Sequence, residues 1–201
     1  MVGPATGITD AGEPGRIGSG PTVWLVTDDA VFRDADPLDL PGMLEAQRET
    51  AALTSGTAPT DETLATLADR TRGALGADDP THHRIRVVAA PTGAPEADRS
   101  RGPVISYAWI ERRPGDTAFL VDFHVAEPQR GSGLAGALFD EMSAVATAWG
   151  CRVIEFRVGR SNHRALRFFR RRGATFHPTD EAERSPLAGI LAIDGPDRRS
   201  A

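Results

Sequence analysis

The chain has 201 residues, of which 40% are hydrophobic and 25% are charged, and its formal net charge is −5. This length and composition are typical of one globular domain. No run of about 18 apolar residues occurs, so a membrane span is not expected, and the first twenty residues lack the apolar segment of a secretory signal.

Arginine supplies all 23 basic side chains of the sequence, because lysine is absent. A chain without lysine cannot form a Schiff base through a side-chain amine, and it lacks the phosphate-binding lysine of P-loop NTPases and protein kinases. The single cysteine, Cys151, has no partner for an internal disulfide. A reducing, cytoplasmic setting is therefore expected.

Charge is divided unevenly between the two halves of the chain. Residues 1–100 hold 16 acidic and 8 basic side chains, whereas residues 101–201 hold 12 acidic and 15 basic ones. The C-terminal half therefore suits an anionic ligand and the N-terminal half a cationic one. Nucleic-acid binding is not expected, because the chain is acidic overall and has no basic stripe interleaved with aromatic residues.

Hydrophobic periodicity and turn residues divide the chain into helices and strands. Residues 1–20 and 195–201 are predicted to be flexible tails, which leaves residues 21–194 as one domain. The predicted elements, in chain order, are a strand at 23–26, helices at about 37–50 and 60–75, strands at 84–90, 104–112 and 118–126, a helix at 134–150, a strand at 151–158, a short helix from about 162 to 173 and a strand at 187–193. This order predicts an α+β fold.

The strand at 118–126 carries two ionisable side chains within an otherwise apolar pattern. Strict alternation places Leu120, Asp122 and His124 on one face of this strand. The predicted helices at about 37–50 and 60–75 are acidic, which favours a cationic ligand over an anionic one near them.

Three glycines mark the junction between that strand and the following helix. They lie in the segment Val125-Ala126-Glu127-Pro128-Gln129-Arg130-Gly131-Ser132-Gly133-Leu134-Ala135-Gly136. A helix start presents unpaired N–H groups and the positive end of a dipole, and glycine lets an anion approach the backbone without meeting a Cβ. The segment therefore predicts a phosphate-binding site.

Two short motifs occur in a fixed order, one before and one after the strand at 151–158. The pattern Arg/Gln-x-x-Gly-x-Gly/Ala is matched by Arg130-Gly131-Ser132-Gly133-Leu134-Ala135. The pattern Asn-x-x-Ala-x-x-Leu/Phe-Tyr-x-x-x-Gly-Phe aligns with Asn162, Ala165, Phe168, Phe169, Gly173 and Ala174. Together they resemble the GCN5-related N-acetyltransferase (GNAT) superfamily over about residues 22–193. The resemblance implies a mixed, mostly antiparallel sheet of six to seven strands, about four flanking helices and a splayed parallel strand pair.

The resemblance also implies acetyl-CoA or another acyl-CoA as cosubstrate and an amine acceptor, in a small molecule or a peptide. Backbone N–H groups from Gly131 to Ala135 would hold the pyrophosphate beside Arg130, with help from the Ser132 hydroxyl. An N–H close to Val125 would polarise the thioester carbonyl. The arginines at 167 and 170–172 could meet the 3′-phosphate. The implied cofactor-binding residues are Phe123, Val125, Arg130, Gly131, Ser132, Gly133, Leu134, Ala135, Asn162, Ala165, Phe168 and Phe169.

In this family the amine attacks the thioester directly, without an acyl-enzyme, so a base must first take the ammonium proton. Asp122 and His124 are candidates for that base, and Glu127 at the strand end is a third. Structural roles stay open, because Asp122 could pair with an arginine and His124 could be a hydrogen-bonded core imidazole. Where the family usually has a tyrosine that protonates the leaving thiolate, this chain has Phe169.

Two other functions stay open. Phe169 is compatible with a catalytically silent module that binds or senses acyl-CoA. Residues 131–136 also match the G-x-G-x-x-G fingerprint of dinucleotide-binding oxidoreductases, although Asp122 and His124 do not suit a strand buried on both faces. The histidines lack metal-ligand spacing, so no metal is expected, and a homodimer stays open.

Overall fold

The computed structural model describes residues 31–55, 57–77, 79–89, 103–180 and 185–193. The predicted strand at 23–26 and both predicted tails lie outside these residues. The described elements are β1 (Val31–Asp34), η1 (Pro37–Asp39), α1 (Leu40–Ser55), α2 (Asp61–Gly76), β2 (His83–Ala89), β3 (Val104–Arg112), β4 (Thr117–Val125), η3 (Glu127–Gln129), α3 (Leu134–Ala148), β5 (Val153–Val158), α4 (His163–Arg171), β6 (Thr175–Pro178) and β7 (Leu187–Ala192).

The ends of the helices follow the predicted capping residues. The Thr60 hydroxyl accepts a hydrogen bond from the Thr63 N–H at the start of α2, and the Asn162 side chain accepts one from the Ala165 N–H at the start of α4. The first predicted helix, at 37–50, is longer than expected and runs to Ser55. Strands β1 and β6 were not predicted, because four residues are too few to show an alternating pattern.

The seven strands form one sheet in the order β1-β2-β3-β4-β5-β7-β6. Every neighbouring pair is antiparallel except β4 and β5, which confirms the mixed sheet and the single parallel pair. The dinucleotide-binding alternative is wrong, because it requires a largely parallel sheet. Parallel pairing ends at Leu120 and Phe156, although β4 continues to Val125. The two strands therefore splay apart.

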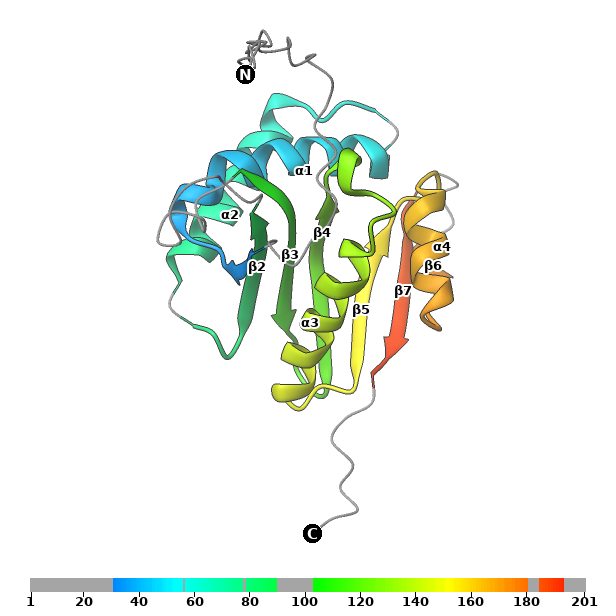
Figure 1. The fold of residues 1–201 in the computed structure, drawn as a ribbon. Coiled ribbons are helices and arrows are strands. Elements are labelled where there is room, and N and C mark those ends of the chain that lie inside the picture. The colour runs from blue at the N-terminus through cyan, green and yellow to red at the C-terminus, as the bar shows by residue number, and fades with distance from the viewer. Residues whose placement is uncertain (1–30, 56, 78, 90–102, 181–184, 194–201) are drawn as a thin grey trace, which may run out of the picture.

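Helices cover both faces of the sheet (Figure 1). One face packs on α3 and α4 around Leu138, Met142 and Leu166, within a large buried cluster. The other packs on α1 and α2 around a smaller cluster that contains Met43 and Tyr107. The sheet therefore separates two apolar cores. The candidate site residues Phe123, His124 and Val125 lie at the end of β4, where β4 and β5 no longer pair.

A β-bulge in β4 overturns the predicted alternation. Asp122 lies opposite Trp109 of β3, but the next pair joins Ile110 to Leu120, so Val121 is the extra residue. Leu120 consequently packs in the cluster beneath α3, whereas the Asp122 carboxylate reaches Tyr107 in the cluster beneath α1 and α2. The prediction that Leu120 shares a face with Asp122 and His124 was wrong, because strict alternation does not survive an inserted residue.

Gly189 on β7 is required by the packing of Phe156. A Cβ built on Gly189 would lie 2.2 Å from Phe156 Cε2, far inside van der Waals contact. We expect Gly189→Ala to lower the free energy of unfolding by about 1–3 kcal/mol, the usual effect of overpacking, as measured by urea denaturation.

Gly73→Ala is the matched control, because a Cβ on Gly73 in α2 meets nothing within 4 Å. It should stabilise the protein by up to about 1 kcal/mol through helix propensity. Equal unfolding midpoints for the two variants would contradict this account of Gly189.

Candidate functional site

The turn before α3 exposes backbone N–H groups at a helix start. Gly131 and Gly133 have φ angles of 93° and 94°, a region that glycine occupies most readily. Gly133 is the N-cap residue of α3, and it makes no side-chain hydrogen bond to the first turn of the helix. The Ser132 hydroxyl, which was predicted to help hold a phosphate, instead donates to the Gln129 carbonyl (2.7 Å) and accepts from the Leu134 N–H (3.3 Å). The positive end of the α3 dipole therefore faces the space beside the glycines.

A groove of about 920 Å³ lies beside this helix start, between α4 and the C-terminal half of α1. Ser161, before α4, donates a hydrogen bond to the Leu53 carbonyl of α1 (3.2 Å), and both residues line the groove. Of the twelve predicted cofactor-binding residues, Ser132 and Leu134 are absent from the lining, and Leu134 is fully buried. The other ten line the groove together: Phe123, Val125, Arg130, Gly131, Gly133, Ala135, Asn162, Ala165, Phe168 and Phe169.

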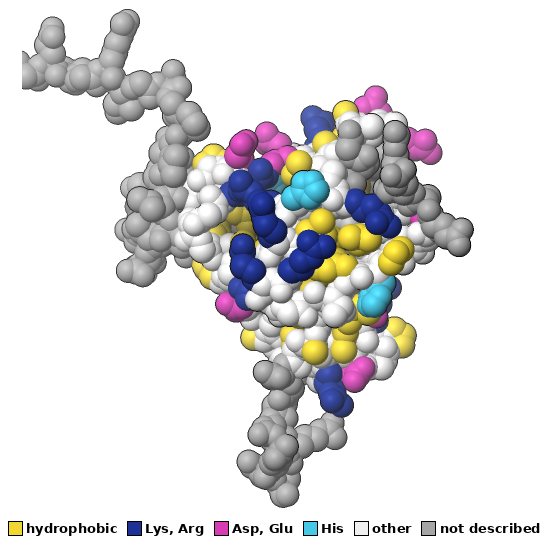
Figure 2. Space-filling view, turned by 90° about the vertical axis from the view of Figure 1, so that its right-hand side faces the viewer, with side chains coloured by type: hydrophobic (Ala, Val, Ile, Leu, Met, Phe, Trp, Pro, Cys, Tyr) yellow, Lys and Arg dark blue, Asp and Glu magenta, His cyan; other side chains and the backbone are white. Residues whose placement is uncertain are grey.

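Arginine dominates the charge of the groove. Figure 2, which views the face that carries α4, shows arginine side chains gathered around exposed hydrophobic ones. No acidic side chain occurs among the described residues that line the groove. The lining arginines are Arg130, Arg164, Arg167, Arg171 and Arg172. Such a site favours a ligand with several negative charges, such as one with more than one phosphate group.

Two of the predicted phosphate-binding arginines have partners within the protein. The Arg172 guanidinium donates to Asp140 Oδ1 (3.0 Å) and to the Gly136 carbonyl (3.1 Å), which ties α4 to α3. Arg170 stacks on Phe176 at 5.4 Å and is not among the lining residues. Arg164, which the sequence analysis did not single out, lies in the groove instead.

The β4 edge that faces β5 becomes accessible where the strands splay. The Ala126 N–H donates to the Ile105 carbonyl of β3 (2.9 Å). Because successive N–H groups point to opposite edges of a strand, the Val125 N–H points away from β3 and toward the groove. The Phe123 N–H differs, since it donates to Asp122 Oδ1 (2.8 Å). Val125 therefore offers the donor that could polarise a ligand carbonyl.

Aromatic rings form the apolar floor of the groove. Phe169 is 4% exposed and stacks on Phe156 at 4.0 Å, and Phe168 stacks on Phe123 at 5.8 Å. Phe139 of α3 meets Phe169 edge-on at 5.6 Å. These five residues, here called the phenylalanine cluster, fill the wedge between the splayed strands. The cluster supplies no proton donor.

The Asp122 carboxylate belongs to a buried polar network rather than to the groove. The Tyr107 hydroxyl donates to Asp122 Oδ2, and the Phe123 N–H donates to Oδ1. Burial raises the pKa of Asp122, although the Tyr107 hydrogen bond opposes this shift, and burial raises the pKa of Tyr107 well above its usual value. Asp122 lies outside the lining of the groove and of the second cavity described below.

His124 lies between two hollows of the protein and lines both. The residue is 7% exposed, its Nδ1 lies 3.2 Å from Thr50 Oγ1, and its ring stacks on Tyr107 at 6.0 Å. Nε2 lies 3.8 Å from Glu49 Oε2, beyond hydrogen-bond length. Burial lowers the pKa of His124 below the usual 6.5, an effect that Glu49 opposes and Arg130 reinforces. The lowered pKa favours the neutral imidazole at pH 7.

Glu49 of α1 connects His124 to the glycine turn. Its carboxylate forms an ion pair with the Arg130 guanidinium, and Arg130 Nε donates to the Val125 carbonyl (2.9 Å). Sequence analysis missed Glu49 and Thr50, because nothing local in α1 distinguishes them from other polar residues of the helix.

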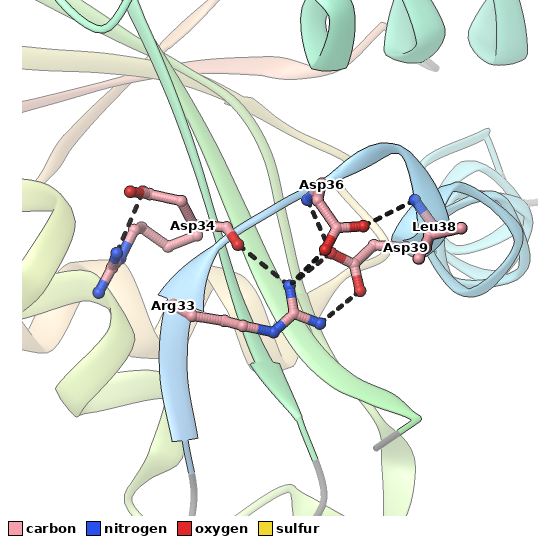
Figure 3. Close-up of polar contacts among 6 residues, drawn as sticks. Arg33, Asp34, Asp36, Leu38 and Asp39 are labelled. Atoms are coloured by element: carbon pink, nitrogen blue, oxygen red, sulfur yellow. Dashed lines mark hydrogen bonds and ion pairs between the residues drawn. The ribbon is translucent and has the colours of Figure 1, made fainter. Parts of the chain in front are cut away.

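A second cavity, of about 650 Å³, opens on the other side of His124. Its walls come from β1, η1, α1 and the ends of β3 and β4, and Arg33 is among the lining residues. Figure 3 shows the polar contacts of the Arg33 side chain with its acidic neighbours. Arg33 forms a bidentate ion pair with Asp39 (2.6 and 2.7 Å), which raises the pKa of Arg33. The lining carboxylates are Asp36, Asp39, Glu45, Glu49 and Glu127. This acidic cavity suits a cationic ligand.

The residues that the structure describes offer neither a membrane-spanning helix nor a cluster of metal ligands. None of the helices there combines the length and the apolarity needed to cross a lipid bilayer. The same residues contain no group of three or more histidine, cysteine, aspartate or glutamate side chains placed to hold a metal ion.

A splayed parallel pair above a glycine-rich helix start defines an N-acetyltransferase-like fold. The PaiA N-acetyltransferase from Thermoplasma acidophilum in complex with coenzyme A is similar over 82% of this chain and 99% of its own, with 13% identity and a TM-score of 0.64. A GCN5-related N-acetyltransferase from Kribbella flavida matches 83% of this chain and 99% of its own, with 23% identity and a TM-score of 0.62.

A third similar structure is a phosphinothricin acetyltransferase from Sinorhizobium meliloti in complex with AcCoA. It shares 20% identity over 82% of this chain and 89% of its own, with a TM-score of 0.58. The family model of the acetyltransferase (GNAT) family matches residues 64–174, more than half of the chain. The protein belongs to this family, as the two sequence motifs predicted.

The glycine turn generates a test of ligand binding. We expect Gly133→Asp to weaken coenzyme A binding by about tenfold or more, equivalent to about 1.4 kcal/mol, because the carboxylate and Cβ would occupy the anion path. Isothermal titration calorimetry measures the affinity.

Gly115→Asp is the matched control. Gly115 has a φ angle of 84°, lies in the β3–β4 hairpin and lines neither hollow, so it carries similar backbone strain without touching the groove. Equal losses of affinity in both variants would show that strain alone, and not the anion path, is responsible.

Proposed function

We propose that this protein transfers an acetyl or other short acyl group from acyl-CoA to an amine, by direct attack and without an acyl-enzyme. One observation carries the proposal: a buried imidazole, His124, lies between an arginine-lined groove and an acidic cavity. Transfer from an anionic donor to a cationic acceptor requires a basic binding site and an acidic binding site, with a proton acceptor between them. Membership of the acetyltransferase family supports the same reaction class.

The cosubstrate is acetyl-CoA or another acyl-CoA, and the groove is its site. The helix start at Gly131 and Gly133 receives the pyrophosphate, with Arg130 beside it. Arg164 and Arg167 on α4 line the same groove and would meet a further phosphate there. The phenylalanine cluster contacts the pantetheine arm, whose apolar stretches match its surface.

The thioester carbonyl accepts a hydrogen bond from the Val125 N–H at the open edge of β4. Negative charge develops on this oxygen as the amine attacks, and one such donor typically lowers the barrier by roughly 3–4 kcal/mol. The oxygen returns to a carbonyl when the C–S bond breaks and coenzyme A leaves as a thiolate.

His124 is the base that takes the ammonium proton. Its Nδ1–H donates to Thr50 in this assignment, which leaves the Nε2 lone pair for the proton. Asp122 holds Tyr107 and the β4 bulge in place, since both of its oxygens already accept hydrogen bonds. Glu127 lies in the wall of the acidic cavity and attracts the acceptor. Of the three residues first considered as the base, His124 fits that role best.

The acceptor is a cationic amine that occupies the acidic cavity. Arg33 pairs with Asp39 and also lies 3.9 Å from Asp36 Oδ2, so Glu45 and Glu127 provide the attraction. A primary amine is an ammonium ion at neutral pH, and it reaches His124 from the wall formed by α1.

Phe169 leaves the thiolate without the tyrosine acid that the family usually supplies. General acids commonly accelerate such steps by about 10² to 10⁴, but a thiol has an unperturbed pKa near about 8.5, so its thiolate leaves without an acid more readily than an alkoxide would. The transferred proton then reaches the thiolate through water.

The deciding experiment incubates the purified protein with acetyl-CoA and a panel of monoamines, linear diamines and amino-acid amides, and measures free thiol. Amine-dependent thiol release, with acetylated amine detected by mass spectrometry, is expected. Thiol release no faster than hydrolysis for every amine would overturn the proposal.

A silent acyl-CoA-binding module is the second candidate, and Phe169 is the observation that favours it. It predicts that acetyl-CoA raises the melting temperature while no amine is acetylated. The same thiol assay, run beside a thermal-shift assay, separates the two functions.

The pH dependence of the rate tests the role of His124. Because its pKa lies below 6.5, the active neutral form predominates at pH 7, and kcat/KM should fall as the pH drops through that lower pKa. His124→Gln should remove this acidic limb and lower kcat by about 10² to 10⁴. The exposed His177 on β6 provides the control, and His177→Gln should keep the parent profile. An unchanged acidic limb in His124→Gln would exclude His124 as the base.

The acidic cavity gives a further prediction. The double variant Glu45→Gln with Glu127→Gln should raise KM for a cationic acceptor about tenfold, with KM for acetyl-CoA nearly unchanged, because loss of two carboxylates weakens the local attraction. Glu62→Gln, in the first turn of α2 and outside both hollows, is the charge-matched control. Steady-state kinetics with both substrates varied measures the two constants. Equal KM values in parent and double variant would show that the acceptor binds elsewhere.

A further inference from the structure

One carboxylate, Glu49 on α1, lies next to the Arg130 guanidinium of the groove and the His124 imidazole, which lines both hollows. Its Oε1 pairs with the Arg130 guanidinium beside the glycine turn, and its Oε2 lies 3.8 Å from His124 Nε2. Glu49 itself lines the acidic cavity, whereas the next residue, Thr50, lines the groove. Glu49 therefore links the arginine-lined groove to the acidic cavity.

Arg130 pairs with one carboxylate, Glu49, and hydrogen-bonds to one backbone carbonyl. Its Nε donates to the Val125 carbonyl, which anchors the side chain, while its Nη2 reaches Glu49. The same side chain lines the groove beside the helix start that suits a diphosphate. A diphosphate bound there competes with Glu49 for the guanidinium, because a guanidinium pairs with phosphate and carboxylate in the same geometry.

We propose that Glu49 is a positioning residue that couples cofactor binding to the base, because a diphosphate beside Arg130 shifts the Glu49 carboxylate from Arg130 to His124. This inference rests on the proposed function, in which His124 is the base. The closer carboxylate would strengthen the base only when the acyl donor is bound.

The proton balance of the step is simple. The acceptor ammonium gives one proton to His124 Nε2, and the amine lone pair then attacks the thioester carbon. The imidazolium that forms donates from Nδ1 to Thr50 and from Nε2 toward Glu49, so the carboxylate stabilises the new positive charge. The tetrahedral adduct still carries an extra proton on its nitrogen, and it loses this second proton to water as the C–S bond breaks and the amide forms. The first proton passes from the imidazolium through water to the coenzyme A thiolate, which restores the neutral imidazole.

The groups that face His124 are few and come from each element packed against it. They are Glu49 and Thr50 from α1, the Tyr107 ring from β3, and Arg130 from the segment between η3 and α3. The Asp122 carboxylate lies behind Tyr107. Glu49 and Arg130 oppose each other in their effect on the pKa of His124, so a change in their pairing must change that pKa.

The test measures binding and titration, neither of which requires turnover. In Glu49→Gln, the diphosphate no longer competes with a carboxylate for Arg130. Coenzyme A should therefore bind about 3- to 10-fold more tightly by calorimetry, which is the scale of one partly exposed ion pair. In the parent, coenzyme A should raise the pKa of His124 followed by NMR, and Glu49→Gln should abolish most of that rise. Glu49→Asp keeps the charge and should restore part of it.

Activity supplies an independent readout. Glu49→Gln should lower kcat about tenfold and move the acidic limb of the pH profile to lower pH, because the base becomes weaker. Tighter cofactor binding with slower turnover is a combination that loss of a structural contact would not produce. Glu62→Gln removes the same charge in the first turn of α2, outside both hollows, and it should leave coenzyme A affinity unchanged.

Equal or weaker coenzyme A binding in a folded Glu49→Gln protein would overturn the coupling, as would a His124 titration that responds to coenzyme A as strongly as in the parent. These results are distinct from failure of the proposed function. If no amine is acetylated, the binding and NMR measurements still decide whether Glu49 links the groove to His124.

Discussion

The site depends on the point at which β4 and β5 stop pairing. Parallel hydrogen bonding ends at Leu120 and Phe156, and the phenylalanine cluster fills the wedge beyond it. A continuous sheet would have hydrogen-bonded the Val125 N–H to β5. The interruption instead turns that donor toward the groove, and the β-bulge at Val121 directs Asp122 toward the α1 side of the sheet. The ligand-facing edge thus arises from incomplete pairing, which the aromatic packing maintains.

Asp122 and His124 show how two ionisable groups on one strand acquire different roles. Asp122 accepts hydrogen bonds from a hydroxyl and a backbone N–H, and burial raises its pKa, so it is held in a satisfied network. His124 is equally enclosed, but its Nε2 lies beyond hydrogen-bond distance of Glu49 and borders two hollows. Burial therefore comes with satisfied carboxylate oxygens at Asp122, whereas His124 keeps an Nε2 without a hydrogen bond to Glu49, as the proposed base requires.

The features that sequence analysis found are local ones. The glycine turn, the caps at Thr60 and Asn162 and the two motifs each depend on neighbouring residues, and the structure brings ten of the twelve expected cofactor-binding residues to one groove. The features it missed depend on distant pairings. The bulge requires the β3 register, and the Glu49–Arg130 ion pair joins residues 81 positions apart, so neither leaves a periodic signal.

The position of α1 between the two hollows has a kinetic consequence. Glu49 faces one hollow and Thr50 the other, so the helix forms a partition with His124 at its edge. A ligand in the groove does not fill the acidic cavity, and the reverse also holds, so two ligands can be bound at the same time. For the proposed acyl transfer, this arrangement corresponds to a sequential scheme in which both substrates are bound before the chemical step.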